Sequence, residues 1–333
     1  MAAGSGEFLR HLPNFEAIPS DMRKALEDFD GKAREIIKSK LGHLENAPPP
    51  PTIYHYTDDL GLRGILESGQ LWLTDIFGLN DPSELKHGFS VAIETLAKRA
   101  AEGPRVSQIF ARDFALLLER GGIEQVAHFF LCAFSSRGDD LGQWRVYADN
   151  GRGYALGFEA KSLEEGFTKP DGVQSPNNGT FPVQYEDGLL REVYDCLIDR
   201  MFHLLSLPKG RNLDSPTINA YMAELQLRLT FHALGPVLYF KHEAYSNEQE
   251  YRFLQVHRAD LPAPTVKLRH RPYALVRYRE FDWRKVAPTS LKRIVIGPAA
   301  DADMAYRFAT DCLRFFGVNS VEIEQSKIPY RAV

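Results

Sequence analysis

A histidine between two tyrosines marks the part of the chain that is richest in side chains capable of chemistry. Residues 54–57 read Tyr-His-Tyr-Thr on a predicted strand where aliphatic side chains are expected. His55 and Thr57 can hydrogen-bond a ribose, and the ring of Tyr56 can stack on a flat ligand ring. The same residues are equally compatible with buried tyrosines and a histidine that bonds to nearby backbone. This run alone therefore leaves a ligand site and an ordinary core equally open.

Two glutamates form the second candidate, late in the chain. Glu248 and Glu250 lie two residues apart, so in an extended segment their side chains point to the same side. With Lys241 and Arg252 beside them, the two carboxylates can stabilise an oxocarbenium-like centre or activate a hydroxyl. The alternative is a solvated charged turn, which is the usual fate of such a run.

The third candidate follows a predicted buried strand in the middle of the chain. Ser135 ends that strand, and Gln143, Trp144 and Arg145 come soon after it. A tryptophan next to an arginine can hold an aromatic ring and a phosphate in one pocket. In the structural alternative, Ser135 and its neighbour cap the next helix and Trp144 belongs to the core.

Two further polar segments have simpler explanations. Asp81, Pro82 and Glu84 form a capping box, which accounts for most of that segment as the start of a helix. A basic concentration occupies residues 267–279 and can contact nucleic-acid phosphates, but a solvated strand face explains it as well. Its members, besides Lys267, are Arg269, His270, Arg271, Arg277 and Arg279.

Other chemistries lack their sequence patterns. The ten histidines are scattered and no Cys-x-x-Cys occurs, so we expect no metal site. Glycine-rich dinucleotide and P-loop motifs and a GxSxG nucleophile elbow are also missing. Three cysteines are a poor disulfide framework, and no apolar run reaches bilayer length, so we expect a cytoplasmic protein without membrane contact. A net charge of −4 limits any nucleic-acid contact to a local patch.

The elements that must position these residues alternate between strands and helices, which indicates an α+β architecture. Residues 1–47 form an N-terminal helical extension, with a helix predicted over 20–41, and Pro48 to Pro51 form a linker. Residues 52–333 form one domain with a helical insertion at about 187–233. Near its start, a short helix ended by Gly69 joins two strands. Further strands are predicted at 129–134, 153–158, 181–185, 250–256, 274–278, 293–296 and 320–323, and helices at 82–101 and 301–316.

Seven motifs in this order resemble a widely distributed bacterial family that is catalogued only as a domain of unknown function. They span about residues 53–300 and give no activity. They are YHYT at 54–57, ILESGQLWLTD at 65–75, LNDPSE at 79–84, CAFS at 132–135, QWRVYADNGRGYALGF at 143–158, KHEAYSNEQEYRF at 241–253 and IVIGP at 294–298.

Residues 55–71 also resemble, more distantly, the opening of the ADP-ribosyltransferase superfamily, and His55, Ser135 and Glu250 follow in that superfamily's order. The resemblance implies its fold, with mixed central sheets, and NAD as a substrate. The acceptor would be a macromolecule, either protein or nucleic acid, and the protein a toxin or phage-defence effector. A nucleotide-binding module without catalysis, an NAD hydrolase and a phosphotransferase are the alternatives.

The same resemblance implies a role for each candidate residue. Glu250 would stabilise the oxocarbenium-like centre through the ribose 2′-hydroxyl, while Glu248 orients the incoming nucleophile. His55 and Thr57 would hold the nicotinamide-side ribose. Tyr56 or Trp144 would stack on the nicotinamide, and Arg145 would bind the pyrophosphate. Phe134-Ser135-Ser136 stands where the superfamily has Ser-Thr-Ser, and the helical insertion has no counterpart there.

Overall fold

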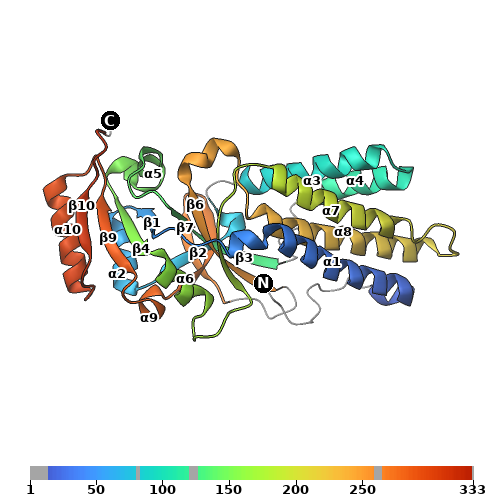
Figure 1. Cartoon of the computed structure of the whole chain (residues 1–333), viewed down its shortest axis with the longest axis horizontal. Coiled ribbons are helices and arrows are strands. Elements are labelled where there is room, and N and C mark those ends of the chain that lie inside the picture. Colours follow the sequence, from blue (N-terminus) through green and yellow to red (C-terminus); the bar gives the residue numbers. More distant parts are fainter. Residues whose placement is uncertain (1–13, 80–82, 120–126, 259–264, 332–333) are drawn as a thin grey trace.

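The strands of the computed structural model form one ten-stranded mixed sheet, in the order β10-β9-β4-β1-β3-β2-β8-β7, with β6 and β5 joined through β3 (Figure 1). The structure describes residues 14–79, 83–119, 127–258 and 265–331. The strands are β1 (Thr52–Thr57), β2 (Leu71–Asp75), β3 (Ala127–Ser135), β4 (Tyr154–Glu159), β5 (Asn178–Pro182), β6 (Glu250–Arg258), β7 (Lys267–Arg271), β8 (Ala274–Phe281), β9 (Leu291–Ile296) and β10 (Glu322–Gln325).

The sheet divides into two arms along one edge of β3. On that edge β2 pairs with Phe130 and Leu131, whereas β1 pairs only at Ser135, opposite Tyr54. The other edge of β3 pairs with β6 along its whole length. One arm continues through β4, β9 and β10, and the other through β8 and β7. We call the gap between β1 and β2, over residues 132–134 of β3, the fork.

A short helix closes the fork from one side. Helix α2 (Asp59–Ser68) joins β1 to β2, with the carboxylate of Asp58 accepting a hydrogen bond from the backbone N–H of Gly61 at its start. At its end Gly69 has a left-handed conformation with φ of 69°, as the sequence predicts. The predicted strand, helix and strand are therefore confirmed.

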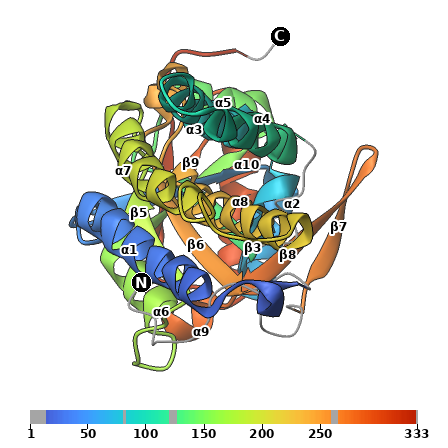
Figure 2. The same cartoon turned by 90° about the vertical axis from the view of Figure 1, so that its right-hand side faces the viewer.

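Two hydrophobic clusters cover the two faces of the sheet. One face packs against α2, α6 (Ala160–Thr168), α9 (Trp283–Val286) and α10 (Ala302–Phe315). The other packs against long helices that we call the helical layer; they lie across the sheet in Figure 2. The helical layer consists of α1 (Ser20–Glu45), α3 (Ser83–Ala101), α4 (Arg105–Glu119), α7 (Gly188–Leu205) and α8 (Ser215–Val237). The remaining helix is α5 (Leu141–Tyr147).

The N-terminal helix and the helical insertion belong to one packed unit. Met22, Leu26 and Phe29 of α1 share a hydrophobic cluster with α7 and α8, and the same cluster includes Phe129 and Leu254 of the sheet. The prolines at 48–51 therefore separate α1 from the rest of the chain in sequence but not in packing.

A buried ionic network connects α8 to α1 inside the helical layer. Arg228, 1% exposed, is paired with Glu224 and, through Nε at 3.2 Å, with Asp30 Oδ2. His232 Nε2 lies 2.9 Å from the other oxygen of Asp30. Arg228 and His232 therefore each lie against a carboxylate, as buried polar groups require.

Most predicted elements occur within a few residues of their predicted bounds, and some predictions need correction. The N-terminal helix predicted over 20–41 continues to Glu45. β5 ends at Pro182, so the strand predicted at 181–185 lies three residues too far along the chain. No pattern predicted α4, α6 or α9. The predicted capping box lies partly outside the described residues, because these exclude 80–82.

Candidate functional site

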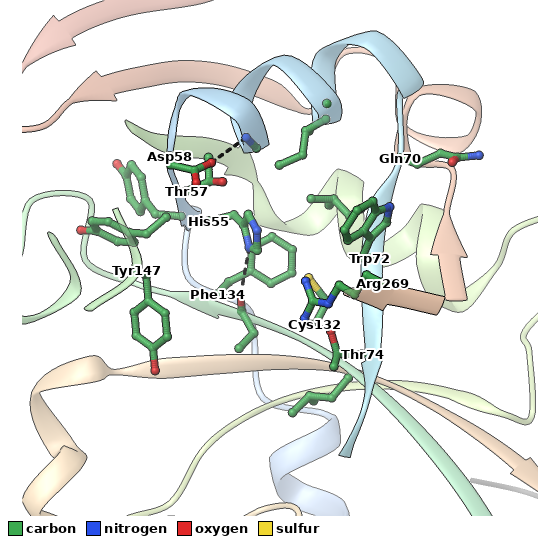
Figure 3. Close-up of a pocket in the computed structure, with 18 of the residues that line it drawn as sticks. His55, Thr57, Asp58, Gln70, Trp72, Thr74, Cys132, Phe134, Tyr147 and Arg269 are labelled. Atoms are coloured by element: carbon green, nitrogen blue, oxygen red, sulfur yellow. Dashed lines mark hydrogen bonds between the residues drawn. The ribbon is translucent and has the colours of Figure 1, made fainter. Parts of the chain in front are cut away.

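A cavity of about 950 Å³ occupies the fork of the sheet (Figure 3). Its walls are formed by β1, α2, β2, the unpaired edge of β3 and β7. Side chains alternate between the two faces of a sheet along each strand, and paired residues of neighbouring strands share a face. This rule shows that residues enter the cavity from both faces of the sheet. Ser135, Glu250 and Trp72 come from the face that carries the helical layer, whereas His55 and Cys132 come from the opposite face.

His55 lies at the centre of the fork and is held in one tautomer. Its Nδ1 lies 3.3 Å from the carbonyl oxygen of Ala133, so Nδ1 carries the proton and donates. Burial lowers the pKa of His55, and the nearby charge of Arg269 lowers it further, so the ring is neutral at neutral pH. Nε2 therefore has a lone pair and can accept a hydrogen bond from a ligand hydroxyl.

The other two residues of the first candidate run have different surroundings. Tyr56 lines the cavity but is buried, and its hydroxyl donates to the carbonyl oxygen of Arg137 at 2.8 Å. Its ring packs edge-to-face on Trp144 with centroids 4.8 Å apart. Thr57 is partly exposed in the cavity, against Gly61 of α2. Thr57 is available to a ligand, whereas Tyr56 mainly holds the start of the 137–140 segment.

Ser135 and Glu250 face each other on neighbouring strands. They are direct partners in the β3–β6 register, and Ser135 is also the partner of Tyr54 on β1. The Ser135 hydroxyl donates to the carbonyl oxygen of Glu248 at 2.6 Å and accepts from the backbone N–H of Arg137 at 3.0 Å. Ser135 therefore fixes the entry into β6, where the two glutamates lie.

The two glutamates converge, but not through strand alternation. Glu248 ends a short 3₁₀ segment (Glu243–Glu248), and Gln249 adopts a left-handed conformation with φ of 43°. The prediction of one extended segment over 248–250 is therefore wrong. Lys241 brings the carboxylates together, because its Nζ lies 2.6 Å from Glu248 Oε2 and 3.4 Å from Glu250 Oε2.

Glu250 is a buried and ionised carboxylate. Burial alone would raise the pKa of Glu250, but the charges of Arg252 and Lys241 outweigh it and hold the pKa below its usual range. Arg252 Nε donates to Glu250 Oε1 at 2.7 Å and Nη2 donates to Oε2 at 3.1 Å. Glu250 thus faces the cavity in the charged form that could stabilise a positive centre.

The structure does not bring the whole third candidate to the cavity. Gln143 is 7% exposed and lines the cavity. Trp144 is fully buried, and its Nε1 donates to Asp139 Oδ1 at 2.7 Å, so it cannot stack on a ligand there. Arg145 is exposed and lies outside the cavity lining, so it does not serve a phosphate in the cavity. The cap of α5 is Asp140, not Ser135.

Among the cavity residues that the sequence does not assign to this site, three can bind a ligand directly. Trp72 on β2 is 43% exposed, and Arg269 and Arg271 on β7 are half-buried. Figure 3 shows Arg269 pointing into the cavity beside Trp72 and Cys132. Residues 267, 269 and 271 share a strand face, and this alternation was the available signal. It was interpreted as a nucleic-acid patch or a solvated face.

Comparison with known proteins gives a family without an activity. The model of a family described as a protein of unknown function (DUF2971) matches residues 143–253, about a third of the chain. The matched segment includes Gln143 and both glutamates, but neither His55 nor Arg269. No curated protein and no solved structure matches the chain. Among the described helices, none is long and apolar enough to cross a membrane.

Proposed function

We propose that the chain is an ADP-ribosyltransferase-like enzyme that cleaves NAD and transfers ADP-ribose to a protein or nucleic acid. The supporting observation is that His55, Ser135 and Glu250, which the superfamily resemblance groups in one site, line one cavity. They come from three strands that lie side by side in the order β1, β3, β6 although they are far apart in sequence. Such convergence at a concave site is typical of ligand-binding residues.

The geometry gives each residue a chemical task. The neutral His55 accepts a hydrogen bond from a ribose hydroxyl through Nε2, and Thr57 donates to the same sugar. The bond between ribose C1′ and nicotinamide breaks, and nicotinamide leaves with the electron pair. The negative charge of Glu250 stabilises the resulting oxocarbenium-like centre. The acceptor nucleophile then bonds to C1′ and transfers its proton to Glu248.

Two observations favour the second candidate, a nucleotide-binding module without catalysis. Both carboxylate oxygens of Glu250 already accept hydrogen bonds, from Arg252 and Lys241. In addition, His55 and Glu250 enter the cavity from opposite faces of the sheet. A ligand that touches both must lie within the fork, and one that lies on a single face would be bound but not cleaved.

Nicotinamide release distinguishes these candidates. The purified chain is incubated with NAD and the macromolecular fraction of a cell lysate, beside Glu250→Gln and the control Glu243→Gln. Glu243 is exposed on the same 3₁₀ segment. We expect release by the wild type and the control, and at least about 100-fold slower release by Glu250→Gln. Bound NAD without release by the wild type would contradict the transferase and support the binding module.

A further inference from the structure

Two arginines on β7 form a cationic wall inside the cavity. Arg269 and Arg271 lie two residues apart, so both side chains are on the cavity face of the strand. One nitrogen of Arg269, Nη2, donates to the Thr74 hydroxyl at 3.0 Å. One nitrogen of Arg271, Nη1, donates to the carbonyl oxygen of Gly78 at 2.8 Å. Neutral oxygens orient both guanidinium groups without neutralising them.

The neighbouring cations of the same hairpin have partners that compensate them. Lys267 Nζ lies 2.7 Å from Glu280 Oε1, and Arg277 Nε lies 2.9 Å from Asp75 Oδ2. Within the described residues, no carboxylate pairs with Arg269.

The other lining carboxylates have partners away from the two arginines. Lys241 pairs with both Glu248 and Glu250, and Glu280 pairs with Lys267. Glu67 pairs with Arg63 on α2, and Asp58 accepts a backbone hydrogen bond at the start of that helix. On the β7 wall of the cavity the uncompensated charge is therefore positive.

Burial makes this imbalance costly for the empty cavity. Nε of Arg269 is buried and has no hydrogen-bond partner in the described part of the chain. Burial lowers the pKa of Arg269, and the charge of Arg271 lowers it further. An uncompensated buried cation raises the free energy of the folded chain, and an anion within hydrogen-bonding reach would offset that.

Trp72 provides a flat apolar surface beside the arginines. Its ring packs on Tyr278 with centroids 4.4 Å apart, and the guanidinium of Arg269 lies 5.5 Å from the ring centroid. An indole that remains 43% exposed in a cavity can stack on a nucleobase, while an adjoining arginine binds the phosphate next to that base.

We propose that Arg269 and Arg271 bind the diphosphate of the dinucleotide, and that Trp72 stacks on one of its bases. Alternate residues of a strand are about 6.6 Å apart, which lets two guanidinium groups each take one phosphate of a diphosphate. The identity of the ligand as a dinucleotide rests on the proposed function, but the binding of a diphosphate does not. Because Arg269 and Arg271 line a cavity and are half-buried, their guanidinium groups are open to a small ligand that enters it rather than to a nucleic-acid backbone on the surface.

Calorimetric binding tests the diphosphate site without any cleavage. The probes are ADP-ribose, inorganic pyrophosphate and, as a neutral control, adenosine. We expect ADP-ribose to bind the wild type and to bind Arg269→Met or Arg271→Met about 10- to 100-fold more weakly, the effect of losing a charge-assisted hydrogen bond. Lys292→Met is the control, because it removes one positive charge at an exposed position of β9 outside the cavity lining. It should bind like the wild type.

Fluorescence gives a second readout. Of the three tryptophans, Trp144 and Trp283 are fully buried, so quenching by ADP-ribose reports Trp72. We expect quenching in the wild type and none in Trp72→Phe.

The outcomes separate this inference from the proposed function. Equal binding of ADP-ribose to the wild type, Arg269→Met and Arg271→Met overturns the diphosphate site, whether or not nicotinamide is released. Equal binding of adenosine and ADP-ribose to the wild type overturns it as well. Arginine-dependent binding of ADP-ribose with no nicotinamide release confirms the diphosphate site and contradicts the transferase.

Discussion

Two arginines of this molecule have opposite surroundings. Arg228 in the helical layer is 1% exposed and is paired with Glu224 and Asp30. Arg269 at the fork is half-buried, and among the described residues it has a hydroxyl and an aromatic ring as partners and no carboxylate. In the helical layer, carboxylates of the chain itself neutralise the charge of Arg228. At the fork, the charge of Arg269 is left for a ligand.

The comparison separates a charge that supports structure from one that supports binding. A buried ion pair whose members already neutralise each other offers no charge that a ligand could pair with. Removing one member leaves the other charges buried and unpaired, with the full desolvation penalty. An orphaned cation in a cavity gains its partner only when a ligand binds. The two regions should therefore respond in opposite ways to the same substitution.

The largest expected effect is on folding stability. Arg228→Met should lower the free energy of unfolding by about 3–5 kcal/mol, because Glu224 and Asp30 lose the cation that they share. Arg269→Met should leave the free energy of unfolding of the ligand-free chain unchanged or raise it. Urea unfolding followed by circular dichroism measures both. A large loss of stability in Arg269→Met would show that this arginine also serves the fold, and the contrast would disappear.

A glycine in each region gives an intermediate effect. A Cβ at Gly61 in α2 would lie 1.8 Å from Thr57 Oγ1, so Gly61→Ala should displace Thr57 and cost about 1 kcal/mol or more. A Cβ at Gly31 in α1 meets nothing within 4 Å, so Gly31→Ala should raise the free energy of unfolding by about 0.5–1 kcal/mol. Thermal unfolding checks both variants. Melting temperatures that shift in the same direction by similar amounts in the two variants would contradict the tight packing of α2 against Thr57 at the fork.

The smallest expected effect is the pH dependence that His55 contributes. The pKa of His55 is lowered in the folded chain, while the unfolded chain takes up this proton near a pH of about 6.5. The stability from this residue is therefore complete above that pH and falls as the pH drops toward the lowered folded pKa.

Stability curves between about pH 5 and 7.5 test this for the wild type, His55→Gln and Arg269→Met. We expect a shallower acid loss in His55→Gln. In Arg269→Met we expect the loss of stability at acid pH to be slightly shallower than in the wild type, because the charge of Arg269 helps to lower the pKa of His55. An acid loss in His55→Gln as steep as that of the wild type would show that His55 does not titrate as described.

Local signals in the sequence predicted local structure well. Gly69 predicted the end of α2, the continuous apolar run at 129–134 predicted β3, and the alternation at 250–256 predicted β6. The N-terminal helix was predicted from the spacing of its apolar residues, such as Met22 and Leu26. The α+β class followed from these elements, and the mixed sheet was implied by the superfamily resemblance; both are confirmed at that level.

The site depended on information that local patterns do not carry. The fork arises because β1 and β2 pair with different parts of β3, which is a long-range choice. The burial of Trp144 depends on a partner, Asp139, that a helix pattern cannot identify. The left-handed turn at Gln249 lacks the glycine that usually marks one. For β7, a charged alternating run looks the same whether it faces water or a cavity.

The most direct test is a crystal structure of the wild-type chain with a carbocyclic NAD analogue that cannot be cleaved. We expect the diphosphate within hydrogen-bonding distance of Arg269 and Arg271, and the nicotinamide-side sugar between His55 Nε2 and the carboxylate of Glu250. An analogue bound elsewhere, or bound at the fork with its nicotinamide-side sugar away from Glu250, would contradict a site for NAD cleavage in this cavity.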